Sequence, residues 1–384
     1  MRVITGVDLP PDSPGGSVEL LRDLYLGPDR PIRADVFMLG DAGDAGDAGD
    51  AGDAGDLGDA GDAGDAGDAG GNDPALLAVA GKCLDGPDFW RYVDDLAGAV
   101  RHRFGPAGHG VLHLQHLAFG ATPALLRAFP DRPSLALVHG TDLLFAADHP
   151  TQGEVLREAA AAAHAIVVPT LAMADLLHGL APGVVRRVEH VPWGVPDHLL
   201  AAPPEREPAE PGLPRLLYAG RLTAEKGVET LIVDGARLEG VAVSVAAPAA
   251  QFAALRDRHD LSGVRYLGWL PRPALWRTFA RHDLLLVPST RLEAFGLVAV
   301  EAQACGLPVL YQPVPGLAEV LGDSAVAVDF TDPSGLANTV AWLRRDEAAL
   351  ADLRAAGRRN AARFALSRTA AELARLSAAI GGGP

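Results

Sequence analysis

The chain has 384 residues, which is long for a single hydrophobic core and favours two domains. Its formal net charge of −16 argues against nucleic acid or an anionic membrane surface as a partner. Two cysteines cannot form a disulfide framework, and no apolar run reaches the length of about 18 residues that spans a membrane, so we expect a soluble, cytoplasmic protein without integral membrane association.

Much of the acidic charge lies in one tract. Residues 41–70 repeat Asp-Ala-Gly, with Leu57 as the exception, and their ten Asp leave −6 for the rest of the chain. Gly at every third position is also typical of collagen, but the tract contains no Pro. A polar, self-repelling sequence of this kind cannot bury a core. We therefore predict a disordered insertion, an expanded repeat that the fold does not need.

The first half of the chain alternates apolar, strand-like runs with segments of helical spacing. Such alternation is typical of a parallel sheet with helices on both faces. The predicted strands are 2–9, 34–40, 110–117, 133–140, 165–170 and 186–195, and the predicted helices are 17–26, 89–104 and 154–164.

A Pro-rich, charged stretch without periodicity, residues 201–214, is typical of a linker. The alternation then resumes, with predicted strands 215–220, 241–248, 264–270, 283–289 and 308–313 and predicted helices 226–238, near 248–259 and 274–282. We predict an α/β protein of two doubly wound, Rossmann-like domains facing a cleft. The domains are residues 1–200 and 215–364, and a C-terminal helix within 365–384 crosses back to the first domain.

Two glutamates, Glu293 and Glu301, stand eight positions apart in the stretch RLEAFGLVAVEAQACGLPVL. A helix from near Gly296 to a C-terminal glycine at Gly306 would place Glu293 before it and Glu301 on it. The positive end of that helix would then form an anion site with a carboxylate on either side. The amides that would line it belong to Ala294, Phe295, Gly296 and Leu297.

The segments EAFGLVAVE (293–301) and AGRLTAEKG (219–227), with YLGWLPR between them and PVPGLAEVL after, resemble the retaining family-4 glycosyltransferases of the GT-B fold. The resemblance covers nearly the whole second domain and, more loosely, the order of elements in the first. It implies transfer of a sugar from a nucleoside-diphosphate sugar, with no metal and no other cofactor.

The resemblance also implies roles for particular residues. Arg221 and Lys226 would neutralise the donor diphosphate, Glu301 would hold the ribose, and Glu293 would bind a hydroxyl of the transferred sugar. The backbone at Gly268 and Trp269 would contact the base, and the glycine-rich turn Gly15, Gly16 and Ser17 would face the diphosphate from the first domain.

Histidines cluster at predicted strand ends of the first domain. In the sequence HGTD, His139 would hydrogen-bond the sugar, and Asp142 would orient an acceptor hydroxyl or ammonium. His113 and His116 are interpreted as core or cleft-edge residues. A metal site remains an alternative, but neither H-x-x-H nor H-G-T-D has the i,i+4 spacing of ligands on one helix face.

The acceptor is the least defined part of the function. An acidic surface would concentrate a small soluble, cationic acceptor such as an aminocyclitol, and the excess of Arg over Lys (only Lys82 and Lys226 occur) is typical of GC-rich genes. Both point to antibiotic biosynthesis, for example a streptomycin-type dihydrostreptosyl transferase. Three alternatives stay open: a non-catalytic sugar- or nucleotide-binding partner subunit, a glycosyltransferase of polysaccharide or glycolipid synthesis, and a dinucleotide oxidoreductase. The last would need G-x-G-x-x-G after the first strand, where the chain has PGGS.

Overall fold

The structure is a computed structural model that describes residues 2–27, 30–40, 73–105, 110–207, 213–228 and 240–382. They form two compact units, Met1–Val191 with Thr369–Pro384 and Pro192–Arg368. Three predictions fall wholly or partly outside the described residues: the insertion 41–70, the helix 226–238 beyond Val228, and the middle of the linker, 208–212.

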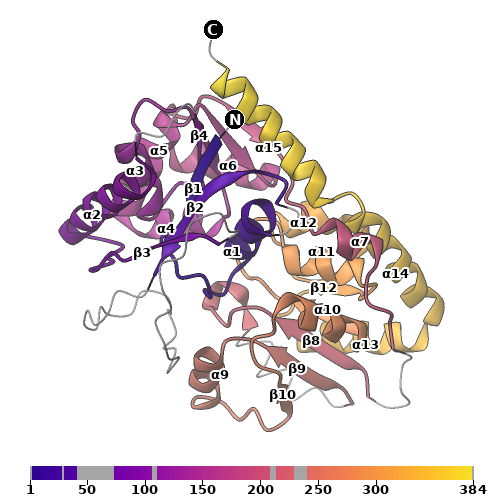
Figure 1. The fold of residues 1–384 in the computed structure, drawn as a ribbon. Coiled ribbons are helices and arrows are strands. Elements are labelled where there is room, and N and C mark those ends of the chain that lie inside the picture. The colour runs from indigo at the N-terminus through magenta and orange to yellow at the C-terminus, as the bar shows by residue number, and fades with distance from the viewer. Residues whose placement is uncertain are drawn as a thin grey trace. The chain divides into compact units, whose positions relative to one another are not determined.

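The first unit contains a seven-stranded parallel sheet in the order β3-β2-β1-β4-β5-β6-β7. Val3 of the central strand pairs with Ala34 on one side and with Val111 on the other. Strands buried on both faces by helices explain the continuous apolar runs of the sequence (Figure 1). The strands are β1 (Arg2–Gly6), β2 (Ala34–Leu39), β3 (Ala75–Leu77), β4 (Gly110–Leu114), β5 (Ser134–Leu137), β6 (Ala165–Val168) and β7 (Val188–His190).

Helices connect the strands of this sheet. Pro87 is the first residue of the longest of them. The backbone N–H at this position has no partner within a helix, so proline, which lacks that N–H, fits there. The helices are α1 (Gly16–Leu21), continued by the π-helical turn η1 (Arg22–Leu26), α2 (Pro87–Phe104), α3 (Ala121–Ala128), α4 (Thr141–Asp148), α5 (Pro150–Ala162) and α6 (Leu171–Leu180).

The second unit contains a six-stranded parallel sheet in the order β10-β9-β8-β11-β12-β13. Apolar side chains of its strands, among them Val243, Val245, Leu284 and Leu286, form one core with the helices. The strands are β8 (Arg215–Ala219), β9 (Ala242–Ala246), β10 (Val264–Tyr266), β11 (Leu284–Val287), β12 (Val309–Tyr311) and β13 (Val326–Ala327).

The helices of the second unit include two whose N-termini are capped by aspartate side chains. Asp332 accepts the amide of Ser334, and Asp346 accepts the amide of Ala349. The helices are α7 (Asp197–Ala201), the 3₁₀ turn η2 (Ala224–Lys226), α9 (Ala249–Arg256), α10 (Arg272–Ala280), α11 (Leu297–Ala304), α12 (Leu317–Leu321), the 3₁₀ turn η3 (Gly322–Ser324), α13 (Pro333–Arg345) and α14 (Glu347–Ala361).

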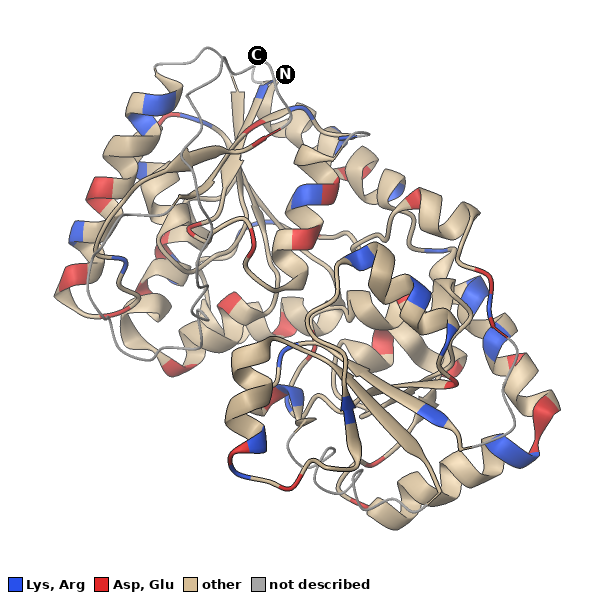
Figure 2. Cartoon of the chain, turned by 60° about the horizontal axis from the view of Figure 1, so that its bottom comes forward, with Lys and Arg blue, Asp and Glu red and all other residues tan. Residues whose placement is uncertain are grey.

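Charged residues lie mainly on helices and loops, and the strands carry few of them (Figure 2). This distribution follows from burial of the strands, because an unpaired charge is costly to remove from water. Within the described ranges, no helix combines the length and the apolar composition needed to cross a bilayer.

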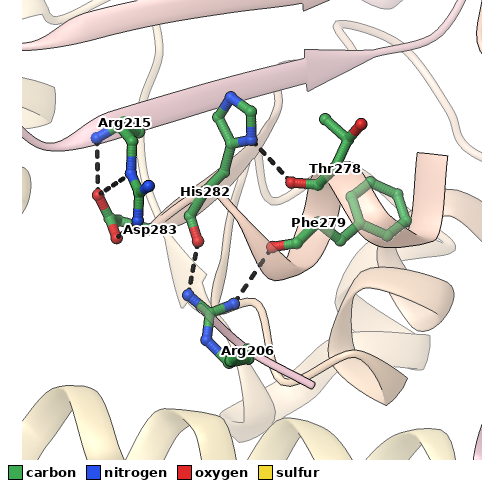
Figure 3. A network of polar contacts seen from close by, with 6 residues as sticks. All are labelled: Arg206, Arg215, Thr278, Phe279, His282 and Asp283. Atoms are coloured by element: carbon green, nitrogen blue, oxygen red, sulfur yellow. Dashed lines mark hydrogen bonds and ion pairs between the residues drawn. The ribbon is translucent and has the colours of Figure 1, made fainter. Parts of the chain in front are cut away.

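The start of the predicted linker is tied to the second unit (Figure 3). Arg206 donates to the backbone carbonyls of Phe279, at 3.2 Å, and His282, at 2.6 Å. Next to them Asp283 accepts the amide of Arg215 at 2.8 Å. Burial, together with the charge of Arg354, lowers the pKa of Arg206 to about 10. The chain is therefore fixed to the end of α10 and the loop after it before β8 begins.

The boundary between the units differs from the predicted one. Residues 192–200 belong to the second unit, because Val195 donates to the carbonyl of Phe364 and accepts the amide of Leu366, both at 2.9 Å. The last helix, α15 (Leu366–Gly381), starts in the second unit and continues in the first from Thr369. There Ser377 contacts His113 of β4.

Candidate active site

In both sheets the strand order reverses at one place, between β1 and β4 in the first and between β8 and β11 in the second. Open parallel sheets bind ligands beyond the carboxyl ends of the strands at such a point. Many of the residues predicted to bind ligands lie in the loops after these strands.

In the second unit, the loops that follow β8 and β11 are packed against each other. The amide of Thr290 donates to the carbonyl of Glu225 at 2.9 Å. Gly227 has φ +64°, and a Cβ there would lie 2.1 Å from the carbonyl oxygen of Pro288. Only glycine permits this approach. The two loops therefore form one edge, fixed by backbone contacts.

A lysine and a glutamate meet at this edge. The ammonium of Lys226 lies 2.5 Å from Oε2 of Glu293, and both side chains are partly exposed. The hydroxyl of Ser289 donates to the same oxygen at 3.0 Å. Ser289, which the sequence analysis did not select, is fully buried after β11. The structure thus brings together Lys226 and Glu293, both predicted to be catalytic. The hydroxyl of Ser289 orients the carboxylate of Glu293.

Arg221 follows β8 and is partly exposed. Its backbone carbonyl accepts a hydrogen bond of 2.5 Å from the hydroxyl of Tyr218. Burial raises the pKa of Tyr218, and the negative charge of Glu293 raises it further, so the phenol stays protonated and donates. Among the described residues, no carboxylate pairs with the guanidinium of Arg221. The guanidinium of Arg221 could therefore pair with an anion at this edge.

Helix α11 begins after Gly296 and, as predicted, ends before Gly306, which has φ +70°. Its first amides have no partner within the helix, so they offer donors and the positive end of the helix dipole. Glu293 precedes the helix, and its amide donates to the carbonyl of Pro315 at 3.3 Å. A Cβ at Gly316 would lie 1.7 Å from the carbonyl oxygen of Glu293. The segment PVPGLAEVL therefore sets the position of Glu293.

The residues leading into α11 differ in exposure. Ala294 and Phe295 are buried, and the ring of Phe295 packs edge-on against Phe364 at 5.1 Å. Gly296 is also buried, whereas Leu297 is partly exposed. The side chains of Ala294 and Phe295 belong to the core, so a ligand would meet these two residues through their backbone.

Glu301 lies one turn into α11 and is only 5% exposed. One carboxylate oxygen pairs with Arg272, and the other accepts the indole N–H of Trp276 at 3.0 Å. Neither Arg272 nor Trp276 was predicted from the sequence as a site residue. Their spacing of four residues on α10 was the available signal, because it places them on one helix face.

The predicted base-contacting turn lies after β10. Gly268 accepts the amide of Ala247 at 3.1 Å, which ties the turn to the end of β9. Trp269 is 42% exposed, unusually high for a tryptophan. An exposed indole on a fixed turn can stack on a planar ligand.

In the first unit, polar side chains surround the ends of β1 and β4. Asp8 is buried, and its carboxylate accepts the amide of Gly120 at 3.0 Å. Lys82 donates to the backbone carbonyl of Asp8, and its charge contributes to the low pKa of His116. The ammonium of Lys82, one of two lysines in the chain, therefore lies at the strand ends where a ligand is expected.

The three histidines have different surroundings. His113 is fully buried between Tyr25 and Ser377, with 2.7 Å from Nδ1 to the Tyr25 hydroxyl and 2.7 Å from Nε2 to Ser377 Oγ. The rings of His116 and His139 lie 4.8 Å apart, and His139 contacts Gln115 at 3.3 Å. Burial lowers the pKa of all three, to about 3 for His113 and His116, so the imidazoles are neutral.

Only His139 of the three is partly exposed, as its predicted contact with a sugar requires. The structure supports the interpretation of His113 as a core residue. In the described part of the chain, no three His, Cys, Asp or Glu side chains converge as a metal site.

Asp142 has a different place from the one predicted. It is fully buried, and its oxygens accept the amides of Leu117 at 2.9 Å, Gly140 at 2.8 Å and His139 at 3.2 Å. Burial raises its pKa to about 6, against the opposing effect of backbone amides that include those of Leu117 and Gly140. The carboxylate joins the loops after β4 and β5, and its predicted contact with an acceptor stays a prediction.

The glycine-rich turn lies where it was predicted, at the start of α1. Gly15 is the N-cap residue, Gly16 is exposed, and Ser17 is partly exposed. Its contact with a diphosphate stays a prediction.

Comparisons with known proteins identify the family and the fold. Residues 204–361 match the family model described as glycosyl transferases group 1. D-inositol 3-phosphate glycosyltransferase 1 of Catenulispora acidiphila is 34% identical over 304 residues, which are 71% of this chain and 72% of that protein.

Two solved structures share the fold over almost the whole chain. Sucrose-phosphate synthase from Thermosynechococcus elongatus superposes with a TM-score of 0.76 at 18% identity, covering 98% of both chains. Anabaena HepE, solved in complex with UDP-glucose, gives a TM-score of 0.74 at 17% identity and covers 99% of this chain and 100% of its own. The two parallel-sheet units therefore have the GT-B fold of glycosyltransferases. Together with the Catenulispora relative, this shows that the chain belongs to the group 1 glycosyltransferases.

Proposed function

We propose that this glycosyltransferase moves a sugar from a nucleoside-diphosphate sugar to a hydroxyl of a small cyclitol, with retention of configuration at the anomeric carbon. The observation that carries the proposal is the meeting of Lys226, Glu293 and the start of α11 at the edge between β8 and β11. It combines cationic and amide donors for a diphosphate with a carboxylate for a sugar hydroxyl.

The donor diphosphate would be bound by Arg221, Lys226 and the first amides of α11. Negative charge grows on the departing phosphate as the bond from the anomeric carbon to oxygen breaks. Fixed donors aimed at that oxygen stabilise the charge without reorganising, which is the largest contribution expected here. In the retaining route that we propose, the acceptor oxygen bonds to the same face, and its proton passes to the departing phosphate oxygen. No enzymic nucleophile and no metal enter this scheme.

The other predicted roles complete the donor site. Glu293, held by Lys226 and Ser289, would accept a hydroxyl of the transferred sugar, and Glu301 would accept the ribose. The backbone at Gly268 and Trp269 would contact the base, and the exposed indole of Trp269 adds a surface on which the base would stack. In the first unit, His139 would donate to the sugar, and the turn at Gly15 would bind phosphate.

Two observations bear on the acceptor. The Catenulispora relative is named for inositol 3-phosphate, and the ammonium of Lys82 at the strand ends of the first unit would favour an anionic, phosphorylated cyclitol. The acidic net charge of the chain would instead favour a cationic aminocyclitol, as in antibiotic biosynthesis. The phosphorylated cyclitol and the aminocyclitol share a ring of hydroxyls, so we propose a cyclitol as the acceptor. Turnover of charged and uncharged cyclitols distinguishes the two.

The test starts with binding. UDP, dTDP, GDP, ADP and NAD are compared by thermal shift, since a ligand that binds the folded state raises the melting temperature. One nucleoside diphosphate should stabilise the wild-type protein and not Lys226→Ala. Stabilisation by NAD alone would overturn the proposal in favour of an oxidoreductase.

Turnover is then measured with the sugar nucleotides of the base that binds, against inositol 3-phosphate, free inositol and an aminocyclitol. Product carrying the anomeric configuration of the donor supports retention, and the opposite configuration excludes it. Tight nucleotide binding without transfer to any of these cyclitols would contradict the proposed acceptor class. Absence of hydrolysis as well would favour the non-catalytic partner subunit.

A further inference from the structure

The carboxylate of Glu301 is held from two sides by one face of helix α10. Arg272 stands at the first position of that helix and pairs with Oε1, and Trp276, one turn later, donates to Oε2 at 3.0 Å. The guanidinium carbon of Arg272 lies 5.3 Å from the centre of the Trp276 ring. The ring in turn packs against His198 of α7 at 5.5 Å. All of these elements belong to the second unit.

Burying the charges of Arg272 and Glu301 costs free energy of folding, which points to a role beyond stability. Side-chain exposure is 12% for Arg272 and 6% for Glu301, so both charges are largely removed from water. A buried ion pair is seldom more stable than apolar side chains of the same size, whereas a buried carboxylate without its cation is strongly destabilising. The pair therefore allows α11 to carry a fixed negative charge near its N-terminus.

A fixed carboxylate retains the capacity to bind a ligand. Each carboxylate oxygen has two lone pairs, so the contacts with Arg272 and Trp276 leave acceptor positions on both. Because each oxygen has its own donor, the plane of the carboxylate cannot rotate freely. Acceptors that are oriented before binding lose less entropy when a ligand arrives.

We propose that Arg272 and Trp276 are positioning residues for the donor nucleotide: they hold Glu301 charged and oriented so that its remaining lone pairs accept the hydroxyls of the ribose. This inference rests on the proposed function, since it presumes a nucleoside-diphosphate donor. It adds two residues that act through Glu301 and not on the reacting atoms. The strength of nucleotide binding depends on them, and the rate of sugar transfer from the bound donor does not.

The test uses the full chain and the nucleoside diphosphate that binds most tightly in the panel of UDP, dTDP, GDP and ADP. Arg272→Gln should raise its Kd, and the KM of the sugar nucleotide, by about tenfold or more, with kcat within about twofold. Trp276→Phe keeps the ring and removes only the N–H donor, so a smaller rise of about threefold to tenfold is expected. Arg272→Lys should restore part of the affinity.

A double-mutant cycle separates action through Glu301 from a general loss of structure. In a Glu301→Gln background, Arg272→Gln should change Kd by less than about twofold, because the group that it orients is already altered. The exposed neighbour Arg277→Gln, on the same helix, is the matched control and should bind like the wild type.

The possible failures can be told apart. If the wild type binds none of the nucleoside diphosphates, the proposed function itself fails. If the wild type binds but Trp276→Phe and Arg272→Lys, folded by their melting curves, bind equally well, the inference alone is overturned. Independent, additive effects of Arg272→Gln and Glu301→Gln on Kd would overturn it too, as would a loss confined to kcat.

Discussion

Lys226 and Glu293, 67 positions apart in the sequence, lie 2.5 Å apart at the carboxyl ends of β8 and β11. The pair puts an ammonium and a carboxylate on one edge, fixed by backbone contacts between their loops. A diphosphate could draw the ammonium away from Glu293 and free the carboxylate for a hydroxyl.

If Lys226 acts as proposed, Lys226→Ala should lower kcat/KM by roughly 10²- to 10³-fold, because it would remove a charge that stabilises the departing diphosphate. Initial rates at varied sugar-nucleotide concentration measure this. Arg277→Ala, on the exposed face of α10, is the charge-matched control and should keep wild-type rates. Wild-type kcat/KM in a folded Lys226→Ala protein would exclude the lysine from catalysis.

Gly316→Ala should destabilise the protein by several kcal/mol, because its Cβ would lie 1.7 Å from the carbonyl oxygen of Glu293 at a φ of +89°. Gly322 stands at the other end of α12, also at positive φ, but a Cβ there meets nothing within 4 Å. Gly322→Ala should cost less, about 1–3 kcal/mol, because it strains the backbone without a steric clash. Urea unfolding compares the two variants, and equal losses would contradict the steric explanation.

Asp142→Asn should lower the free energy of unfolding by about 1–3 kcal/mol. The amide group of Asn can still accept from one side, but its NH₂ would face the N–H of either Leu117 or Gly140, which then loses its acceptor. Asp148→Asn, exposed at the end of the same helix, should change stability by less than about 0.5 kcal/mol. Denaturant titration of both variants tests this, and a neutral Asp142→Asn would show that the carboxylate is dispensable for the fold.

His113 makes stability depend on pH. Burial lowers its pKa from 6.5 to about 3, so below pH 6.5 the unfolded chain takes up a proton that the folded state excludes. This contribution to stability is complete above pH 6.5 and decreases by about 1.4 kcal/mol per pH unit as the pH falls toward 3. The difference in unfolding free energy between wild type and His113→Asn should therefore shrink from pH 7 to pH 5. A difference that stays constant over this range would mean that His113 is not buried in its neutral form.

The sequence predicted the strands well where apolar runs were long, as in 2–9 and 283–289. It missed β3, which has only three residues and follows the repeat, and it missed α4, because the HGTD segment continues an apolar strand without a break in pattern. The ends of α11 were predicted because Gly306 and Pro308 are strong local signals. Helices α13 and α14, with their aspartate caps, could have been predicted from the same kind of signal and were not.

The prediction of the site was limited by contacts between distant segments. Residues such as Lys226 and Glu293 stand in recognisable motifs, but Ser289 and Tyr218 are ordinary side chains whose roles arise from packing. Asp142 shows the opposite limit. An acidic residue after a strand looks available for a ligand in the sequence, and only the fold shows that three backbone amides occupy it.

Helix α15 affects the order in which the protein can be made. His113 and its hydrogen-bond partner Ser377 are separated by 264 positions, so the first unit holds the beginning and the end of the chain. During synthesis, the ribosome must deliver all of the second unit before the helix that covers His113 emerges. The first unit therefore lacks the hydrogen-bond partner of His113 until the last residues of the chain have been made. A truncation after Arg368 would keep every residue of the second unit and remove from the first unit the part of α15 that contains Ser377.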